Sequence, residues 1–93
     1  MTILSEEAVR DAVGELDGWE VAGKEITTAL DFADFRAAVA FVVRIAFEAE
    51  AANHHPDLDI RYNQVRVALS THSEGGVTSN DVDLAQAIDA LRR

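Results

Sequence analysis

The fold class is decided by residues 34–70, which read DFRAAVAFVVRIAFEAEAANHHPDLDIRYNQVRVALS. The stretch from Asp34 to Ala52 has no glycine or proline and many alanines, which at this length predicts a helix. We expect Pro56 to end that helix. Apolar and polar residues then alternate over Leu58–Tyr62 and over Val65–Ser70, which predicts two paired strands. Residues 34–70 therefore combine one long helix with one β-hairpin.

The segments on either side repeat these two structures. A serine followed by acidic residues predicts a helix start near the N-terminus, and two short runs of alternating apolar residues predict another hairpin. After residue 70 two glycines break the chain, and apolar residues with helical spacing follow. The expected features are a helix over Glu6–Leu16, strands over Trp19–Val21 and Ile26–Phe32, a turn at Asn63-Gln64, and a last helix opened by a capping box of Thr78 and Asp81.

The order of these elements indicates the fold class. Tight hairpins join antiparallel neighbours, and the helices between them then cover one face of the sheet. The sequence therefore predicts an α+β fold, with residues 1–93 forming a single domain in the order αββαββα. Its four-stranded antiparallel sheet should carry the helices on one face. The other face should be half-polar, because Asp59, Arg61 and Arg66 alternate with apolar residues.

Composition and charge exclude several classes of partner. The formal net charge is −9 and the eight lysines and arginines are scattered, so no basic surface for nucleic acid is expected. The same acidity and the shortness of the apolar run Ala37–Val43 argue against a membrane. The chain has no cysteine, and Glu6 and Glu7 stand where a signal peptide would be apolar. We expect a cytoplasmic protein.

The long helix over residues 34–52 is apolar over a wider arc than packing on one sheet requires. A helix that covers a sheet needs an apolar stripe of about 100°. The apolar positions of this helix exceed that arc, and a domain of this size gains stability from self-association. We therefore expect a neighbouring subunit on this helix, with an alanine-rich surface as the alternative.

All three histidines, His54, His55 and His72, lie between the end of the long helix and the end of the second hairpin. A hairpin returns its far end beside its start, so one pocket could hold three imidazoles. Imidazole titrates near neutral pH and can both accept and donate protons without a cofactor. Glu50 stands four residues before His54, on the same helix face if the helix extends that far, and could fix one ring.

Simpler interpretations of the same residues stay open. An adjacent His-His pair at a helix end is favoured by the helix dipole alone. Three histidines with Asp81 or Glu50 could bind zinc, but neighbouring residues rarely ligate one ion together and His-x-x-x-His spacing is absent. We expect no metal. Asp81 by itself fits a first-turn helix acid, and Tyr62 by itself fits hairpin packing.

The spacing of the site residues resembles a known family signature. The chain carries Glu50, His54-His55-Pro56, Tyr62, His72 and Asp81, and this set is similar to that of the pterin-4a-carbinolamine dehydratases. The resemblance includes Leu69-Ser70-Thr71-His72 and covers nearly the whole chain from Trp19 onward. Position 58 departs from many relatives, because an aromatic residue is replaced by Leu58, which could alter affinity for a planar pterin.

The resemblance implies a small-molecule pterin substrate and a dehydration without cofactor or metal. Members of the family remove water from 4a-hydroxytetrahydropterin to give quinonoid dihydropterin, in the recycling of tetrahydrobiopterin. By analogy, His54 and His72 are the acid and base, in an order that the sequence leaves open, and His55 binds the pterin. Residues that bind or orient the substrate would be Glu50, Pro56, Tyr62 and Asp81, with Pro56 and Tyr62 mainly architectural. Assembly as dimers or tetramers through the long helix is also implied.

A binding role on the same fold is the alternative function. Some relatives act as binding or assembly modules, and an apolar helix face can receive a foreign helix. Relatives of the assembly type tend to lose part of the histidine signature, whereas this chain keeps all three histidines. The complete signature favours the enzyme.

Overall fold

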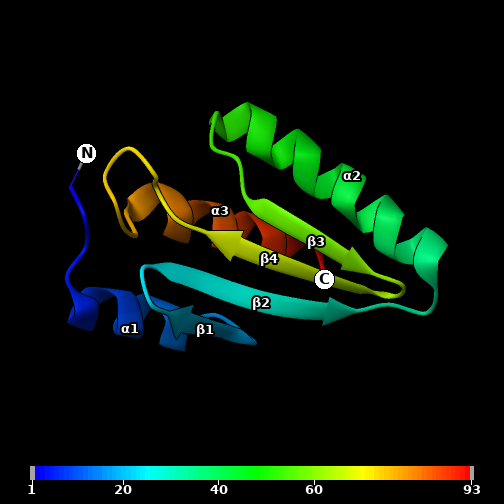
Figure 1. Ribbon diagram of the computed structural model, residues 1–93, viewed down its shortest axis with the longest axis horizontal. Coiled ribbons are helices and arrows are strands. Elements are labelled where there is room, and N and C mark those ends of the chain that lie inside the picture. The colour runs from blue at the N-terminus through cyan, green and yellow to red at the C-terminus, as the bar shows by residue number, and fades with distance from the viewer. Residues whose placement is uncertain (1, 93) are drawn as a thin grey trace.

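The computed structural model describes residues 2–92 and has the predicted order of elements. Figure 1 shows the three helices and four strands along the chain. The α+β class and the order αββαββα are thus confirmed. The elements are α1 (Glu6–Gly14), β1 (Trp19–Ala22), β2 (Glu25–Asp31), α2 (Phe35–Ala52), β3 (Asp57–Arg61), β4 (Gln64–Leu69) and α3 (Ser79–Leu91).

The two hairpins join through their second strands. The strand order is β1-β2-β4-β3 and every neighbouring pair is antiparallel. Ile26 at the start of β2 pairs with Leu69 at the end of β4. This register places the β1–β2 turn at the same end of the sheet as the loop that follows β4. The loops of that end are the ones that carry the histidines.

The helices pack on one face of the sheet and close the core. In Figure 1 α3 lies behind the sheet, and α2 runs along the β3 side. On β2 and β4 every second residue is buried, as the alternation predicts, while the residues between them face solvent or are half-buried. The fully buried aliphatic side chains come from β2, β4 and both long helices, and include Ile26, Ile45, Val65, Leu69 and Ile88.

The long helix begins and ends where the sequence predicts, but a different residue terminates it. Asp34 caps it by accepting a hydrogen bond from the Ala37 backbone N–H at 2.8 Å. The expectation that Pro56 ends the helix was wrong, because α2 stops at Ala52 and Asn53 adopts a left-handed conformation with φ 49°. Asparagine tolerates this conformation better than most residues, which makes it a C-terminal cap. Four residues, 53–56, therefore separate the helix from β3.

Two further boundaries differ from the predictions. The first helix ends at Gly14 and not at Leu16. The second hairpin turns at Tyr62-Asn63 and not at Asn63-Gln64, with Tyr62 at φ 52°. Asn63 stabilises this turn, because its side-chain amide donates to the Phe32 carbonyl at 2.9 Å. This hydrogen bond to the residue after β2 explains the one-residue shift of the turn. It joins residues 31 positions apart, so the local sequence pattern could not predict it.

The outer face of α2 is apolar and uncovered in the single chain. Phe35, Val43 and Phe47 are exposed there, and Phe47 keeps 71% of its surface accessible. The wide apolar arc predicted for this helix is therefore present as an outward face. Within residues 2–92, no helix has both the length and the apolar character needed to cross a membrane.

Candidate active site

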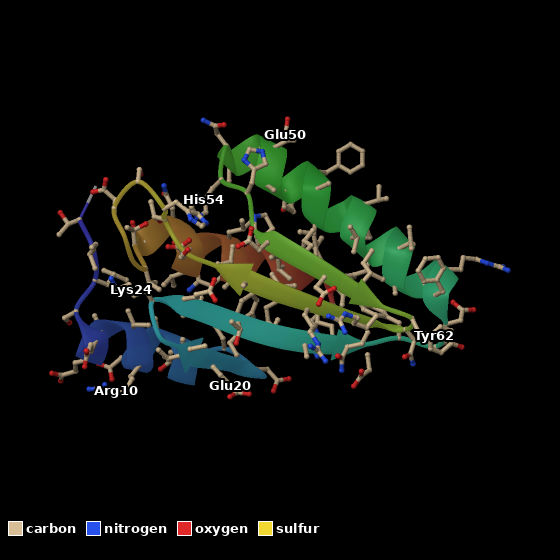
Figure 2. All side chains as sticks on the ribbon, viewed as in Figure 1. Arg10, Glu20, Lys24, Glu50, His54 and Tyr62 are labelled. Atoms are coloured by element: carbon tan, nitrogen blue, oxygen red, sulfur yellow. The ribbon has the colours of Figure 1, made fainter. Side chains whose placement is uncertain are left out.

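The two adjacent histidines leave the end of α2 toward different partners. After the left-handed Asn53, the His54 backbone N–H donates to the Ala49 carbonyl at 3.1 Å, which reverses the chain over the last helical turn. His54 is then half-buried beside α3, whereas His55 is exposed beside α2. Figure 2 shows Glu50 at the end of α2 and His54 below it, toward the sheet.

His54 is paired with a buried carboxylate. Its Nε2 lies 2.5 Å from Oδ1 of Asp81, which is 27 residues further along the chain. The His54 side chain is 12% exposed and the Asp81 side chain is fully buried. A buried carboxylate requires partners for both of its oxygens. The environment of Asp81 therefore determines which atom carries the shared proton.

The second oxygen of Asp81 is held by two threonines. Asp81 Oδ2 accepts from the Thr78 backbone N–H and from the Thr71 hydroxyl, both at 2.8 Å. Because Thr71 donates to Asp81, its own oxygen accepts the neighbouring Thr78 hydroxyl at 2.7 Å. Oδ1 is then the acceptor left for His54, and the network assigns the proton to His54 Nε2. The Nδ1 atom of the neutral His54 ring then carries no proton and can accept one.

Asp81 has both of the roles that the sequence left open. The predicted capping box is present, since Thr78 is the N-cap of α3 and Asp81 occupies the third helical position. One oxygen of Asp81 completes that cap and the other holds an imidazole. The start of α3 and the orientation of His54 thus depend on one side chain.

Glu50 holds His55 and not His54. Glu50 Oε2 lies 2.5 Å from Nε2 of His55, on side chains that are 76% and 59% exposed. Glu50 would share a helix face with His54 only if α2 continued that far, and the helix ends at Ala52. The reversal at Asn53 brings His55 back over Glu50.

His72 lies in an exposed loop whose base is closed by the residues on either side of it. Thr71 and Gly76 form an isolated antiparallel bridge around the loop, and Gly75 adopts a positive φ of 74°. The nearest carboxylate partner of His72 is Asp57, with 4.0 Å between Nε2 and Oδ2, which is too long for a hydrogen bond. The His72 ring is consequently less constrained than the other two.

The three imidazoles share one end of the molecule but do not line one hollow. His54 lines a cavity of about 440 Å³ between α2 and α3. His72 lines another, of about 200 Å³, with Lys24, Glu25 and Ser70. Asp57 links the two regions, since it follows His54 by three residues and faces His72. The predicted single pocket is therefore not formed by the described residues of one chain.

Pro56 and Tyr62, the other two residues of the signature, make no side-chain hydrogen bond or ion pair with the imidazoles that the structure shows. Pro56 is half-buried and leads into β3, one residue before Asp57. Tyr62 is 67% exposed and stands at the opposite end of the sheet from His54, as Figure 2 shows. It lines a shallow cavity with Phe35 and Val39 at the start of α2. In the single chain Tyr62 is not brought to the histidines.

Thr71 is the supporting residue that pattern reasoning did not single out. Its hydroxyl holds Asp81 and its backbone closes the loop that carries His72. The available signal was its place directly before His72 at the end of a strand. A group of three or more His, Cys, Asp or Glu side chains that could hold a metal ion does not occur within residues 2–92.

Comparison with known proteins gives a consistent result. Residues 2–91 match the family described as Pterin 4 alpha carbinolamine dehydratase. A relative from Acidobacterium capsulatum is 48% identical over 91 residues, which are 98% of this chain and 99% of that protein. A relative from Nocardia farcinica is 47% identical over 91 residues, or 98% and 96% of the two chains. Both names place these proteins provisionally among the pterin-4-alpha-carbinolamine dehydratases.

Two solved structures share the fold. One is described as a transcriptional coactivator/pterin dehydratase from Brucella melitensis. It is 40% identical with a TM-score of 0.91, and the match covers 97% of this chain and 98% of that one. The other is a pterin dehydratase-like protein identified as a RuBisCO assembly factor in the alpha-carboxysome. Its TM-score is 0.68 at 21% identity, over 80% and 88% of the two chains, and it demonstrates the fold alone.

Proposed function

We propose a function on the premise that the chain belongs to the pterin 4 alpha carbinolamine dehydratase family. Family membership supports a dehydratase that acts on a pterin. The activity we propose is removal of water from 4a-hydroxytetrahydropterin to give quinonoid dihydropterin, as a step in recycling tetrahydrobiopterin in the cytoplasm. His54, His55 and His72 would perform it.

The reaction requires two proton transfers and no oxidant or reductant. A base removes the proton from N5, and the freed electron pair forms a double bond between N5 and C4a. The bond from C4a to oxygen breaks, and an acid supplies the proton that turns the departing hydroxyl into water. A positioned general acid or base contributes roughly 10²–10⁴-fold to a rate. The chemistry therefore suits imidazoles without a metal or redox group.

The pairing of His54 with Asp81 is the observation that carries the proposal. Asp81 Oδ1 accepts from His54 Nε2, so the neutral ring keeps Nδ1 as a basic nitrogen. When that nitrogen takes a proton, the buried carboxylate lies in place to stabilise the imidazolium. We therefore assign His54 as the base and Asp81 as its positioning residue.

The other two histidines have complementary settings. His72 is exposed and weakly restrained by Asp57, which suits an acid that must reach the departing hydroxyl. His55 is oriented by Glu50 at the surface, which suits a residue that binds the pterin ring. In this proposal Glu50 and Asp81 orient imidazoles, and Pro56 sets the entry to β3. Tyr62 would act only through the assembly.

The test is an ultraviolet assay of freshly generated 4a-hydroxytetrahydropterin with catalytic amounts of protein. We expect acceleration that falls by about 100-fold or more in His54→Ala and in His72→Ala. Asp11→Asn, an exposed change on α1, is the control and should keep full activity. Acceleration no faster than the spontaneous reaction would leave a binding or assembly role on this fold as the better proposal.

We also propose that the outer face of α2 joins two or more copies of the chain. Phe35, Val43 and Phe47 leave an apolar surface that association would cover. Phe47→Asp should shift a dimer or tetramer to monomer, measured by light scattering after size exclusion. Glu48→Gln, which changes a charge one position away on a less exposed residue, should leave the assembly intact. A wild-type chain that is monomeric at high concentration contradicts this proposal.

A further inference from the structure

A hollow that carries two cationic side chains lies next to His72. Lys24 lines the same small cavity as His72, together with Gly75 and Gly76. These three residues, Lys24 and the two glycines, also line a second cavity of about 530 Å³, where Arg10 stands. The two hollows therefore share a wall. Figure 2 shows Lys24 and Arg10 at the end of the sheet where His54 lies.

The sheet register explains why these residues meet. Lys24 is in the turn between β1 and β2, and His72 is in the loop after β4. The pairing of Ile26 with Leu69 brings that turn and that loop to one end of the sheet. The hollow follows from the fold and not from the conformation of one side chain.

Lys24 and Arg10 bring two cations to these cavities in a strongly acidic chain. The formal net charge is −9, and Lys24 is the only lysine. Among residues 2–92, no carboxylate lies within ion-pair distance of the Lys24 amine. Arg10 meets Glu6 at 3.8 Å, on side chains that are largely exposed, which is a weak pairing. Glu6 and Glu25 also line these cavities, but neither lies within ion-pair distance of the Lys24 amine. Lys24 is thus available to an anion from outside the chain, and Arg10 adds a cation that its weak pair with Glu6 leaves largely exposed.

The other lining groups fit the rest of a small polar molecule. Ile3 and Val21 are partly exposed and form an apolar wall that suits a short carbon chain. Ser70 and Glu25 line the part next to His72 and can hydrogen-bond hydroxyl groups. The cavity volume lies within the range of sites that bind small ligands.

We propose that these two adjoining cavities together bind the side chain of the pterin substrate. The preferred side chain ends in an anionic group such as a phosphate ester. Lys24 holds the anion and Arg10 adds to the field beyond it. This inference rests on the proposed function, because it places the reacting ring at His72. Lys24 is then a specificity-determining residue, since it contacts the substrate away from the reacting atoms.

The experiment compares two stable reduced pterins, a hydroxymethyl-dihydropterin and its phosphate monoester, by fluorescence titration of the whole protein. We expect the ester to bind about fivefold more tightly, near the upper limit for an exposed charge pair. Lys24→Gln should remove this preference and leave the affinity for the alcohol unchanged, whereas Lys24→Arg should retain it. The preference should also shrink as salt is added. Because Lys24 is the only lysine, its side-chain resonance should move with the ester and not with the alcohol.

Several outcomes would overturn the inference. Equal affinity for both pterins in the wild type would do so, as would a preference that survives in Lys24→Gln. Inorganic phosphate that binds as tightly as the ester would indicate an anion site unrelated to the pterin. If both pterins bind equally while the dehydration of a neutral substrate is accelerated, the inference fails and the proposed function stands. If neither binds and no acceleration is seen, both are wrong.

Discussion

His54 and His55 are adjacent in the chain, and each has an Nε2 atom 2.5 Å from a carboxylate oxygen, yet the two pairs differ in every other respect. The His54 pair is buried and its carboxylate is held by two threonines, whereas the His55 pair is largely exposed. Water competes for the exposed pair, which limits its contribution to about 0–1 kcal/mol. In the buried pair, loss of one partner leaves the other unsatisfied without water. Equal distances thus correspond to unequal energies.

Removal of the buried carboxylate should have the largest effect. Asp81→Ala deletes the partner of His54, part of the α3 cap and the acceptor of Thr71 together. We expect the free energy of unfolding to fall by about 3 kcal/mol, measured by urea denaturation. The dehydration rate should fall with it, through kcat more than through KM.

The isosteric change separates the two roles of Asp81. Asp81→Asn keeps the shape and one oxygen acceptor, so much of the stability should return while kcat stays at least about tenfold low. An unaltered kcat in a folded Asp81→Asn protein would show that the carboxylate does not position His54.

Thr71→Val should have the next effect, because it removes only the hydroxyl that connects Asp81 with Thr78. Valine matches threonine in shape, so the loss is of hydrogen bonds rather than of packing. We expect a destabilisation of about 1–2 kcal/mol by thermal denaturation. Thr71→Ser restores the hydroxyl and should recover most of it, and failure of this rescue would count against the network.

Glu50→Gln should have the smallest effect. The pair with His55 is exposed, so stability should change by less than about 0.5 kcal/mol in urea denaturation. The change that we expect is a higher KM with kcat retained, since His55 is assigned to binding. A destabilisation as large as that of Asp81→Ala would contradict the comparison on which these predictions rest.

The fold could be predicted further than the site. Alternation on the strands, the Asp34 cap and the Thr78–Asp81 capping box are local signals, and they predicted the order of elements and most of the helix starts. The positive φ values at Asn53 and Tyr62 were not predicted, because Pro56 and Asn63-Gln64 gave the expected helix end and the expected turn at those two places. Asparagine is enriched in the left-handed region, so Asn53 carried a local signal for the helix end, whereas Tyr62 carried none.

The site could be predicted in its membership but not in its pairing. The family resemblance singled out the histidines and Asp81 by spacing alone. The partner of His54 lies 27 residues away and depends on how α3 packs beside α2, which is tertiary information. Which ring Glu50 would fix could not be predicted for the same reason, since the choice depends on where α2 ends.

Thr71 has a consequence for how the protein loses activity with heat. Its amide donates to the Gly76 carbonyl at 2.8 Å and closes the loop of His72, while its hydroxyl is buried against Asp81 at the start of α3. The loop base cannot open alone without breaking contacts of the core, so it belongs to the same cooperative unit as α3. A preparation warmed into its transition should therefore be a mixture of fully competent and unfolded molecules, and not a population of uniformly slowed ones.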